Sequence, residues 1–226
     1  MGNGRTICLK PYTIFLCISK SMHKKILKAE QIQILPILKL FSKDFYLVGG
    51  TALALQMGHR YSLDFDLLTR TNIKRNAIKN ILKNNNYVIQ QVLYEDTIQL
   101  HCIINNVKVT FFQFPFDISP SVHFDGIIKM PDVLTLAAIK AFALAGRGKW
   151  KDYVDLYYIF KHYYTFDQVS NRAKLLFDGA YNEKLFRQQL SYYDDISYEE
   201  EVEYASTPVT VDEIKRFLTE IALTPF

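Results

Sequence analysis

The sequence has few cysteines and lacks the patterns that mark disulfide frameworks and zinc sites. Its three cysteines, Cys8, Cys17 and Cys102, form no Cys-x-x-Cys pair and leave an odd number. They favour a reducing, cytoplasmic setting over a small secreted fold held by disulfides. A P-loop, a Gly-x-Gly-x-x-Gly fingerprint and a Gly-x-Ser-x-Gly elbow are also absent, which excludes the enzyme classes that those motifs mark.

The chain also lacks a long uninterrupted apolar run and a strong excess of one charge. Residues 6–18 are apolar enough to suggest a targeting segment, but Lys10-Pro11 interrupts them and no small-residue cleavage site follows. We therefore expect no membrane association, and we hypothesise that Met22 is the functional start and residues 1–21 a dispensable extension. The net charge of +4 permits a nucleic-acid or nucleotide partner without requiring one.

The pattern of apolar residues predicts an α+β fold. A small mixed β-sheet core with flanking helices is expected over residues 22–118, followed by a helical C-terminal half over residues 119–226 that completes the active site. The expected elements are a helix or helix pair at 22–41, strands at 45–48, 63–68, 87–94, 97–105 and 107–114, an irregular stretch at 118–129, an acidic solvated loop or helix face at 194–203, and helices at 51–57, 72–83, 131–145, 151–162, 171–177, 183–190 and 211–223.

A Gly49-Gly50 pair directly follows the first expected strand and opens a short helix that Gly58 would end. Backbone N–H groups at such a turn can approach a phosphate because no Cβ is in the way. Thr51 would add a hydroxyl and cap the helix. Taken alone, the same residues also suit an ordinary tight turn between a strand and a helix.

Asp64 and Asp66 lie two residues apart on the next expected strand. Their side chains should therefore point to one face, opposite Leu63, Phe65 and Leu67. Two carboxylates so placed suit divalent cations, which prefer hard oxygen ligands and serve phosphoryl transfer in pairs. A pair of surface carboxylates on an edge strand is the alternative. Because one short helix joins this pair to Gly49-Gly50, we expect metal and phosphate sites to face one pocket.

The stretch GGTALALQMGHRYSLDFDLLT resembles the signature of the AbiEii/AbiGii toxin-type nucleotidyltransferases, within the DNA-polymerase-β-like superfamily. The later stretch IKAFALAGRGKWKDYVDLYYIF resembles that family's downstream block, and the two cover about a fifth of the chain. The resemblance implies nucleotide transfer from an NTP, with two Mg²⁺ ions, or Mn²⁺, held by Asp64 and Asp66. It also implies an RNA acceptor, with tRNA favoured, and a cognate antitoxin protein, because some members are toxins that modify the acceptor end of tRNA.

Carried over by position, the resemblance places Gly49, Gly50 and Ser62 at the triphosphate. Arg60, in the GHR segment, would neutralise phosphate charge. Lys140 and Asp152 would match the family's later lysine and aspartate and act in catalysis.

The residues themselves give partial support for the later block. Lys140 lies in an otherwise apolar helix, and Arg147, two turns on, falls on roughly the same face, so that the pair could bind a polyphosphate as a basic stripe. Snorkelling of Lys140 at the edge of the core is an equal alternative. Asp152 and Asp155 share a helix face and could hold these cations in place rather than act as a base.

One departure from the superfamily concerns a third carboxylate, which is usual on a later strand near the attacking hydroxyl. In VKVTFFQF the expected inward position, near Thr110, holds a threonine, which is neither a general base nor a strong metal ligand at neutral pH. Asp96 or Asp117 could substitute, although no spacing requires it. Either this chain works with two carboxylates and a base from the helical half, such as Asp152, or its activity is reduced or lost.

The favoured function is therefore metal-dependent nucleotidyl transfer from an NTP to an acceptor hydroxyl, as the toxin of a toxin–antitoxin or phage-defence pair. One alternative is a catalytically weak or inactive protein of the same fold that binds a nucleotide or a partner. A second is a transferase that acts on a small molecule or a protein.

Overall fold

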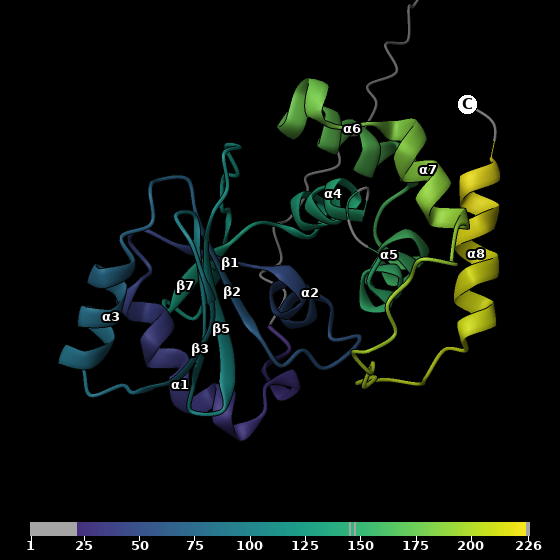
Figure 1. The fold of residues 1–226 in the computed structure, drawn as a ribbon. Helices are drawn as coiled ribbons and strands as arrows, with labels where there is room; N and C mark the ends of the chain where they lie inside the picture. The colour runs from purple at the N-terminus through teal and green to yellow at the C-terminus, as the bar shows by residue number, and fades with distance from the viewer. Residues whose placement is uncertain (1–21, 145, 147, 225–226) are drawn as a thin grey trace, which may run out of the picture.

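A computed structural model describes residues 22–144, 146 and 148–224, and its centre is a five-stranded mixed sheet in the order β1-β2-β5-β4-β3. Figure 1 shows the sheet edge-on, with α1 and α3 on one face and α2 on the other. The helices α4 to α8 form the other half of the molecule, on the α2 side. The elements are η1 (Lys24–Ile26), α1 (Ala29–Leu40), β1 (Tyr46–Val48), α2 (Gly49–Met57), β2 (Phe65–Thr69), α3 (Arg75–Asn84), β3 (Ile89–Glu95), β4 (Gln99–Ile104), β5 (Val107–Gln113), β6 (Val122–Phe124), β7 (Ile128–Met130), α4 (Val133–Leu144), α5 (Trp150–His162), α6 (Phe166–Phe177), η2 (Asp178–Ala180), α7 (Glu183–Ser191) and α8 (Val211–Leu223).

The expected α+β fold with a helical C-terminal half is confirmed, and so is the antiparallel meander β3-β4-β5. Asn105 and Asn106 make the β4–β5 turn with positive φ angles of 50° and 60°, which asparagine tolerates well. Gly58 ends α2 in the left-handed conformation, as expected. The helix or helix pair expected at 22–41 is a short 3₁₀ helix, η1, followed by one continuous helix, α1, that contains Pro36. Pro36 leaves the carbonyl of Ile32 without its helical donor, and because Ile32 is 52% exposed, water can reach that region.

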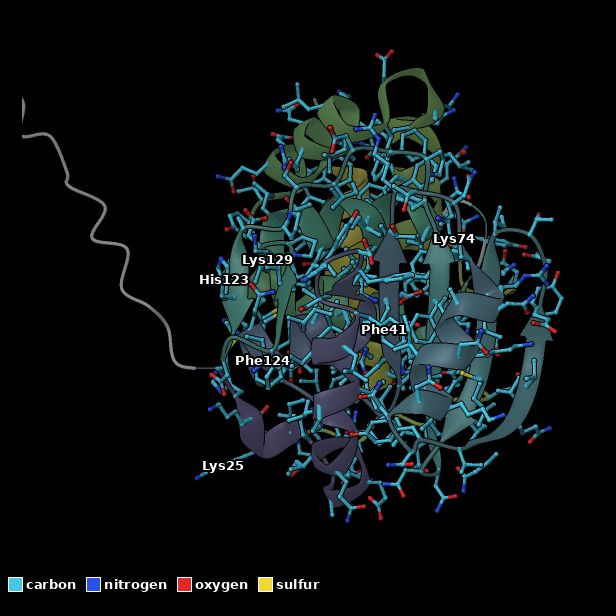
Figure 2. All side chains as sticks on the ribbon, turned by 90° about the vertical axis from the view of Figure 1, so that its left-hand side faces the viewer. Lys25, Phe41, Lys74, His123, Phe124 and Lys129 are labelled. Atoms are coloured by element: carbon cyan, nitrogen blue, oxygen red, sulfur yellow. The ribbon has the colours of Figure 1, made fainter. Side chains whose placement is uncertain are left out.

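The face of the sheet that α1 and α3 cover is closed by an aromatic cluster. Phe41 contacts Phe45 and Phe111 edge to face, with ring centroids 6.0 and 4.9 Å away. Figure 2 looks onto this layer and shows Phe41 near its middle. The packing fixes the turn after α1 against the centre of the sheet and thereby places β1, which leads into the Gly49-Gly50 turn.

Three sequence predictions are wrong in detail. Leu63 is predicted on the buried face of a strand, but β2 begins at Phe65 and Leu63 is 53% exposed. The stretch predicted to be irregular contains the β6–β7 hairpin, which turns at Asp125 and Gly126 with φ angles of 48° and 66°. Figure 2 shows His123, Phe124 and Lys129 together on this hairpin. The sequence does carry its signal, because an Asp-Gly pair between apolar residues is typical of a hairpin turn.

The third error concerns α6, which begins at Phe166 and not near Asn171. Thr165 caps it by accepting from the backbone N–H of Gln168, whose side chain accepts from the N–H of Thr165 in return. The Thr-x-x-Gln pattern in the sequence carries this signal.

The helical half packs onto the sheet half through one continuous hydrophobic core. Tyr153 and Tyr157 of α5 are fully buried in it and serve for packing. The predicted N-terminal extension, residues 1–21, lies outside the described residues. Within the described part of the chain, none of the helices is long and apolar enough to cross a membrane.

Candidate active site

The N-terminus of α2 lies directly against the carboxylate of Asp66. Val48, the last residue of β1, pairs with Asp66 across the antiparallel β1–β2 ladder, and α2 begins at the next residue, Gly49. Gly49 has a φ of 74°, and a Cβ added there would overlap Oδ2 of Asp66 and come within 3.1 Å of its Cγ. A glycine is required here for both reasons. The N-cap residue, Val48, makes no side-chain cap bond, and the first turn of α2 begins beside the Asp66 carboxylate.

At the next residue, Gly50, other side chains again lie very close to the helix backbone. A Cβ at this position would lie 2.6 Å from Nη2 of Arg60 and 2.9 Å from Oγ of Ser62. Both of these predicted triphosphate contacts therefore lie beside Gly50. Arg60 and Ser62 are 3% and 7% exposed, so the chain approaches the helix N-terminus here without leaving room for a side chain at Gly50.

Two buried side chains donate hydrogen bonds to the backbone of the connection that carries Asp64. Thr51 Oγ1 donates to the backbone carbonyl of Asp64, and Gln31 Nε2 donates to that of Ser62 at 2.8 Å. The prediction that Thr51 caps α2 is wrong, because Val48 is the N-cap residue and makes no side-chain bond. Thr51 is 1% exposed and aims its hydroxyl at the connection, so it positions Asp64 instead of facing solvent.

Thr110 occupies the position at which the third carboxylate is expected. Thr110 pairs with Asp66 in the parallel β2–β5 ladder, so the two side chains share one face of the sheet. Two residues earlier on the same face, Lys108 lies with its Nζ 3.9 Å from Oδ2 of Asp64. Sequence reasoning missed Lys108, although the alternation in VKVTFFQF puts it on the face of Thr110.

The two residues considered as substitutes for that carboxylate lie at the other end of the sheet. Asp96 accepts from the N–H groups of Ile98 and Gln99 in the β3–β4 turn, and Asp117 pairs with Arg70 after β2 has ended. The register of β4 and β5 separates this end from the start of β2. Neither can therefore complete a metal site with Asp66.

A buried ionic cluster connects the α2–β2 segment to the helical half. Arg60 binds Asp155 of α5 with two parallel bonds, Nε to Oδ1 at 2.7 Å and Nη2 to Oδ2 at 2.9 Å. His59 Nε2 lies 2.6 Å from Asp155 Oδ1, and Lys140 Nζ lies 2.8 Å from Asp155 Oδ2. Lys140 also donates to Asp152. Lys140 and the two aspartates are all less than 9% exposed, so Lys140 does not snorkel to the surface.

Charge pairing decides the protonation of this cluster. Burial works to raise the pKa of Asp155, but Arg60 and Lys140 outweigh it and hold the pKa well below its usual 3.8. Burial works to lower the pKa of Lys140, yet Asp152 and Asp155 outweigh it, so the pKa is raised and the ammonium stays charged. For His59 burial is the larger effect and lowers the pKa, so the ring is neutral at pH 7. The cluster is thus a network of fixed charges and not a set of groups poised to exchange protons.

The bonds within the buried cluster show a structural role for Arg60. The third Arg60 donor, Nη1, binds the carbonyl of Tyr61 at 2.9 Å, so Arg60 braces the connection beside Gly50. Its direct neutralisation of a phosphate, and a catalytic role for Lys140 and Asp152, stay predictions. Arg147 lies outside the described residues.

Two lysines at the start of α5 extend the site, and sequence reasoning did not include them. Lys149 and Lys151 both pair with Glu200, from the loop between α7 and α8. Burial lowers the pKa of Lys151, Asp64 opposes that change, and Arg60, Lys149 and Lys140 lower it further. Lys151 is therefore close enough to Asp64 and to the buried cluster for their charges to change its pKa.

The donor set at Asp64 and Asp66 suits a divalent cation bound mostly by substrate and water. Both side chains are partly exposed and belong to one short segment, and each offers hard carboxylate oxygens. Over the described residues, no three His, Cys, Asp or Glu side chains gather as a closed metal site. A site of two carboxylates next to a helix N-terminus fits Mg²⁺ that arrives with a triphosphate.

Two comparisons of the sequence with known proteins find relatives of this chain. A family model described as nucleotidyl transferase AbiEii toxin, type IV TA system, matches residues 37–222. An uncharacterized protein of Aquifex aeolicus (strain VF5) is 28% identical over 155 residues, which are 67% of this chain and 75% of that protein.

Solved structures share the fold. MenT4, a nucleotidyltransferase toxin of Mycobacterium tuberculosis H37Rv, superposes with a TM-score of 0.56 over 87% of this chain and 85% of its own, at 13% identity. JHP933 from Helicobacter pylori gives a TM-score of 0.51 over 88% of each chain, at 16% identity.

Proposed function

Because this chain belongs to the AbiEii family of nucleotidyltransferase toxins, we propose that it transfers a nucleotide from an NTP to a hydroxyl of RNA, with tRNA as the favoured acceptor. Nucleotidyl transfer and the toxin role are those of the family. The acceptor, the metal and the roles of individual residues are the proposal. The observation that carries it is the N-terminus of α2, packed against the carboxylate of Asp66 through Gly49.

The triphosphate would lie at the N-terminus of α2. The N–H groups of the first turn and the positive end of the helix dipole favour an anion there. Gly49 and Gly50 allow it to approach the backbone, and Ser62 offers a hydroxyl beside Gly50. The buried bonds from Thr51 and Gln31 keep the Ser62–Asp64 backbone fixed while the ligand binds.

Asp64 and Asp66 would hold Mg²⁺, or Mn²⁺, between the triphosphate and the acceptor. The metal would supply charge stabilisation at the α-phosphate and a lower pKa for the attacking hydroxyl. In the reaction, the acceptor oxygen forms a bond to the α-phosphorus, the bond to the β-phosphate oxygen breaks, and pyrophosphate leaves. Asp155 and Arg60 contribute rigidity, since their buried pair fixes the segment that precedes the two aspartates.

The metal assignment is tested by Asp64→Ala and Asp66→Ala. Each should reduce transfer to background, because each removes a metal ligand from the partly exposed site, while the melting temperature stays near that of the wild type. Transfer would be followed with labelled NTPs, Mg²⁺ and total RNA. Unchanged transfer by both variants would exclude these residues as the metal ligands.

The same assay decides the acceptor. Label in the tRNA fraction is the expected result. Label in a protein band, in a small molecule or in another RNA would contradict the tRNA assignment and identify the true acceptor. Co-expression with the neighbouring gene product would test the expected antitoxin, whose presence should restore growth when this chain is produced.

A second candidate is nucleotide binding with little turnover, which Thr110 favours. Thr110 stands beside Asp66 where a third carboxylate would lie, so the site has one negative ligand fewer for the metals. If NTP binds with Mg²⁺ but no acceptor gains label, this candidate is correct.

A further inference from the structure

The loop between α7 and α8, residues 192–210, is attached to the candidate active site at two places. In the first, Ser197 forms a parallel bridge with Lys149, in which Ser197 N–H donates to the carbonyl of Gly148 at 2.8 Å and Trp150 N–H donates to that of Ser197 at 3.0 Å. In Figure 1 the loop leaves α7, passes α5 and reaches the connection between α2 and β2 before it turns back to α8.

In the second attachment the same loop pairs with the segment that leads to the metal-site aspartates. Tyr61 N–H donates to the carbonyl of Glu203 at 2.8 Å, and Ala205 N–H donates to that of His59 at 3.1 Å. The two attachments fix the backbone on both sides of residues 198–202. An acidic span is therefore held over the edge of the site by main-chain bonds.

Within this span, Glu200 is the carboxylate that enters the site. Its Oε1 lies 2.7 Å from Nζ of Lys149, and its Oε2 contacts Nζ of Lys151. Lys151 is also within the electrostatic reach of Asp64, Arg60 and Lys140. The carboxylate of Glu200 thus holds Lys149 and Lys151 at the start of α5. This place lies near Asp64 and near the buried cluster.

We propose that Lys149 and Lys151 bind the polyphosphate tail of the nucleotide, and that the Glu200 carboxylate occupies this place until the tail displaces it. The proposal deepens the proposed function, on which it rests for the identity of the ligand. It assigns to the free enzyme a built-in competitor for its own substrate.

The contacts suit displacement. The side chains of Lys149, Lys151 and Glu200 are 35%, 24% and 42% exposed, and ion pairs of this exposure contribute little to stability. Lysine acts as a mobile point charge, so both ammonium groups can turn from a carboxylate to a phosphate without backbone movement. A polyphosphate carries several charges where Glu200 carries one, and it should win the exchange.

The decisive measurement is binding of inorganic triphosphate in the presence of Mg²⁺, by titration calorimetry on the full chain. Glu200→Gln should lower the Kd roughly three- to tenfold, because it removes the competing charge while keeping the side-chain size. Lys149→Gln and Lys151→Gln should each raise the Kd. Glu201→Gln is the matched control: Glu201 is the neighbouring exposed carboxylate, it pairs with neither lysine, and its variant should bind as the wild type does.

An unchanged or higher Kd for Glu200→Gln would overturn the proposal and show that Glu200 only positions the lysines or lies outside the binding site. Melting temperatures of all four variants exclude a folding defect as the cause. Because the readout is binding and not transfer, it is independent of the acceptor. If the Asp64 and Asp66 variants contradicted the metal assignment, the effect of Glu200→Gln on the Kd for triphosphate could still be measured. The failure of one proposal can therefore be told apart from the failure of the other.

Discussion

Both the backbone conformation and the geometry of the site require a glycine at position 49. Its positive φ and its closeness to Asp66 are separate requirements, and the chain offers a control for the first of them. Gly126 has a similar φ of 66°, but no atom lies within 4 Å of the place that a Cβ would take there.

We predict that Gly49→Ala abolishes transfer and destabilises the protein by more than Gly126→Ala does. A left-handed alanine costs about 1–2 kcal/mol at either position. At Gly49 the added methyl group must also push the Asp66 carboxylate from its place. Chemical denaturation and the labelled-NTP assay measure both effects. Equal losses in stability, together with retained transfer by Gly49→Ala, would show that the close approach to Asp66 is not needed.

His59 gives the buried cluster a predictable response to acid. Because burial lowers its pKa below the usual 6.5, the unfolded chain binds more protons than the folded one below that pH. Stability should therefore fall as the pH drops below about 6.5, by up to about 1.4 kcal/mol per pH unit for this one group. Asp155 acts at a different pH: its pKa is depressed, so its contribution is complete above about 3.9 and is lost only well below that value.

Urea denaturation from pH 7 to pH 5 tests this prediction with His59→Gln, whose amide nitrogen takes the place of the Nε2 that contacts Asp155. The variant should show a smaller loss of stability over this range than the wild type. His101 also has a pKa lowered by burial, so His101→Gln serves as the comparison for a less buried histidine. An identical pH dependence in the wild type and His59→Gln would contradict the assignment of a neutral, buried His59.

At the scale of elements, the parallel pairing of β2 with β5 decides which residue stands beside Asp66. The register puts Thr110 there, and the meander puts Lys108 next to Asp64. A strand shifted by one residue would have turned both side chains to the opposite face. The ladder therefore makes position 110 the neighbour of Asp66 on this face of the sheet, and the residue there is a threonine.

We predict that Thr110→Asp strengthens metal binding. The new carboxylate would share a face with Asp66, so Mg²⁺ or Mn²⁺ should raise the melting temperature of the variant by more than that of the wild type. Without metal the variant should be less stable, because Thr110 is only 6% exposed and the added charge has no cation. Thr110→Asn, similar in size and uncharged, is the control. A metal-dependent shift no larger than that of the control would show that the position is not a ligand site.

At the scale of the whole molecule, the sheet half and the helical half share a core and a charge network. Arg60 and His59 come from one half, and Asp155 and Lys140 from the other. Removal of the helical half would expose the apolar surface of the shared core to water and would leave Arg60 and His59 without Asp155.

We therefore predict that residues 22–118 alone do not fold cooperatively. The fragment should lack a sharp thermal transition and should bind a hydrophobic dye, whereas the full chain should unfold in one transition. Circular dichroism and calorimetry distinguish the two cases. A fragment that melts cooperatively would show that the sheet half is an independent domain.

The sequence by itself determined the local features of this protein. Gly49-Gly50, the place of Asp66, the meander and the place of Thr110 could be predicted because each depends on residues close together in the chain, through turn chemistry or the two-residue period of a strand. Asp64 is expected on the same strand, but β2 begins only at Phe65. The hairpin at Asp125-Gly126 and the cap at Thr165 belong to the same class, since the sequence carries a local signal for each.

Only the tertiary structure decided the partners of the charged side chains. Asp155 lies 95 residues from Arg60 and 96 from His59 along the chain, and Glu200 reaches Lys149 across 51. Sequence patterns do not encode which distant charges meet, because that depends on how the helical half docks onto the sheet. The physical reason is the cost of burying a charge: once docking removes water, each ion must find a counter-ion, and the choice follows from the packing.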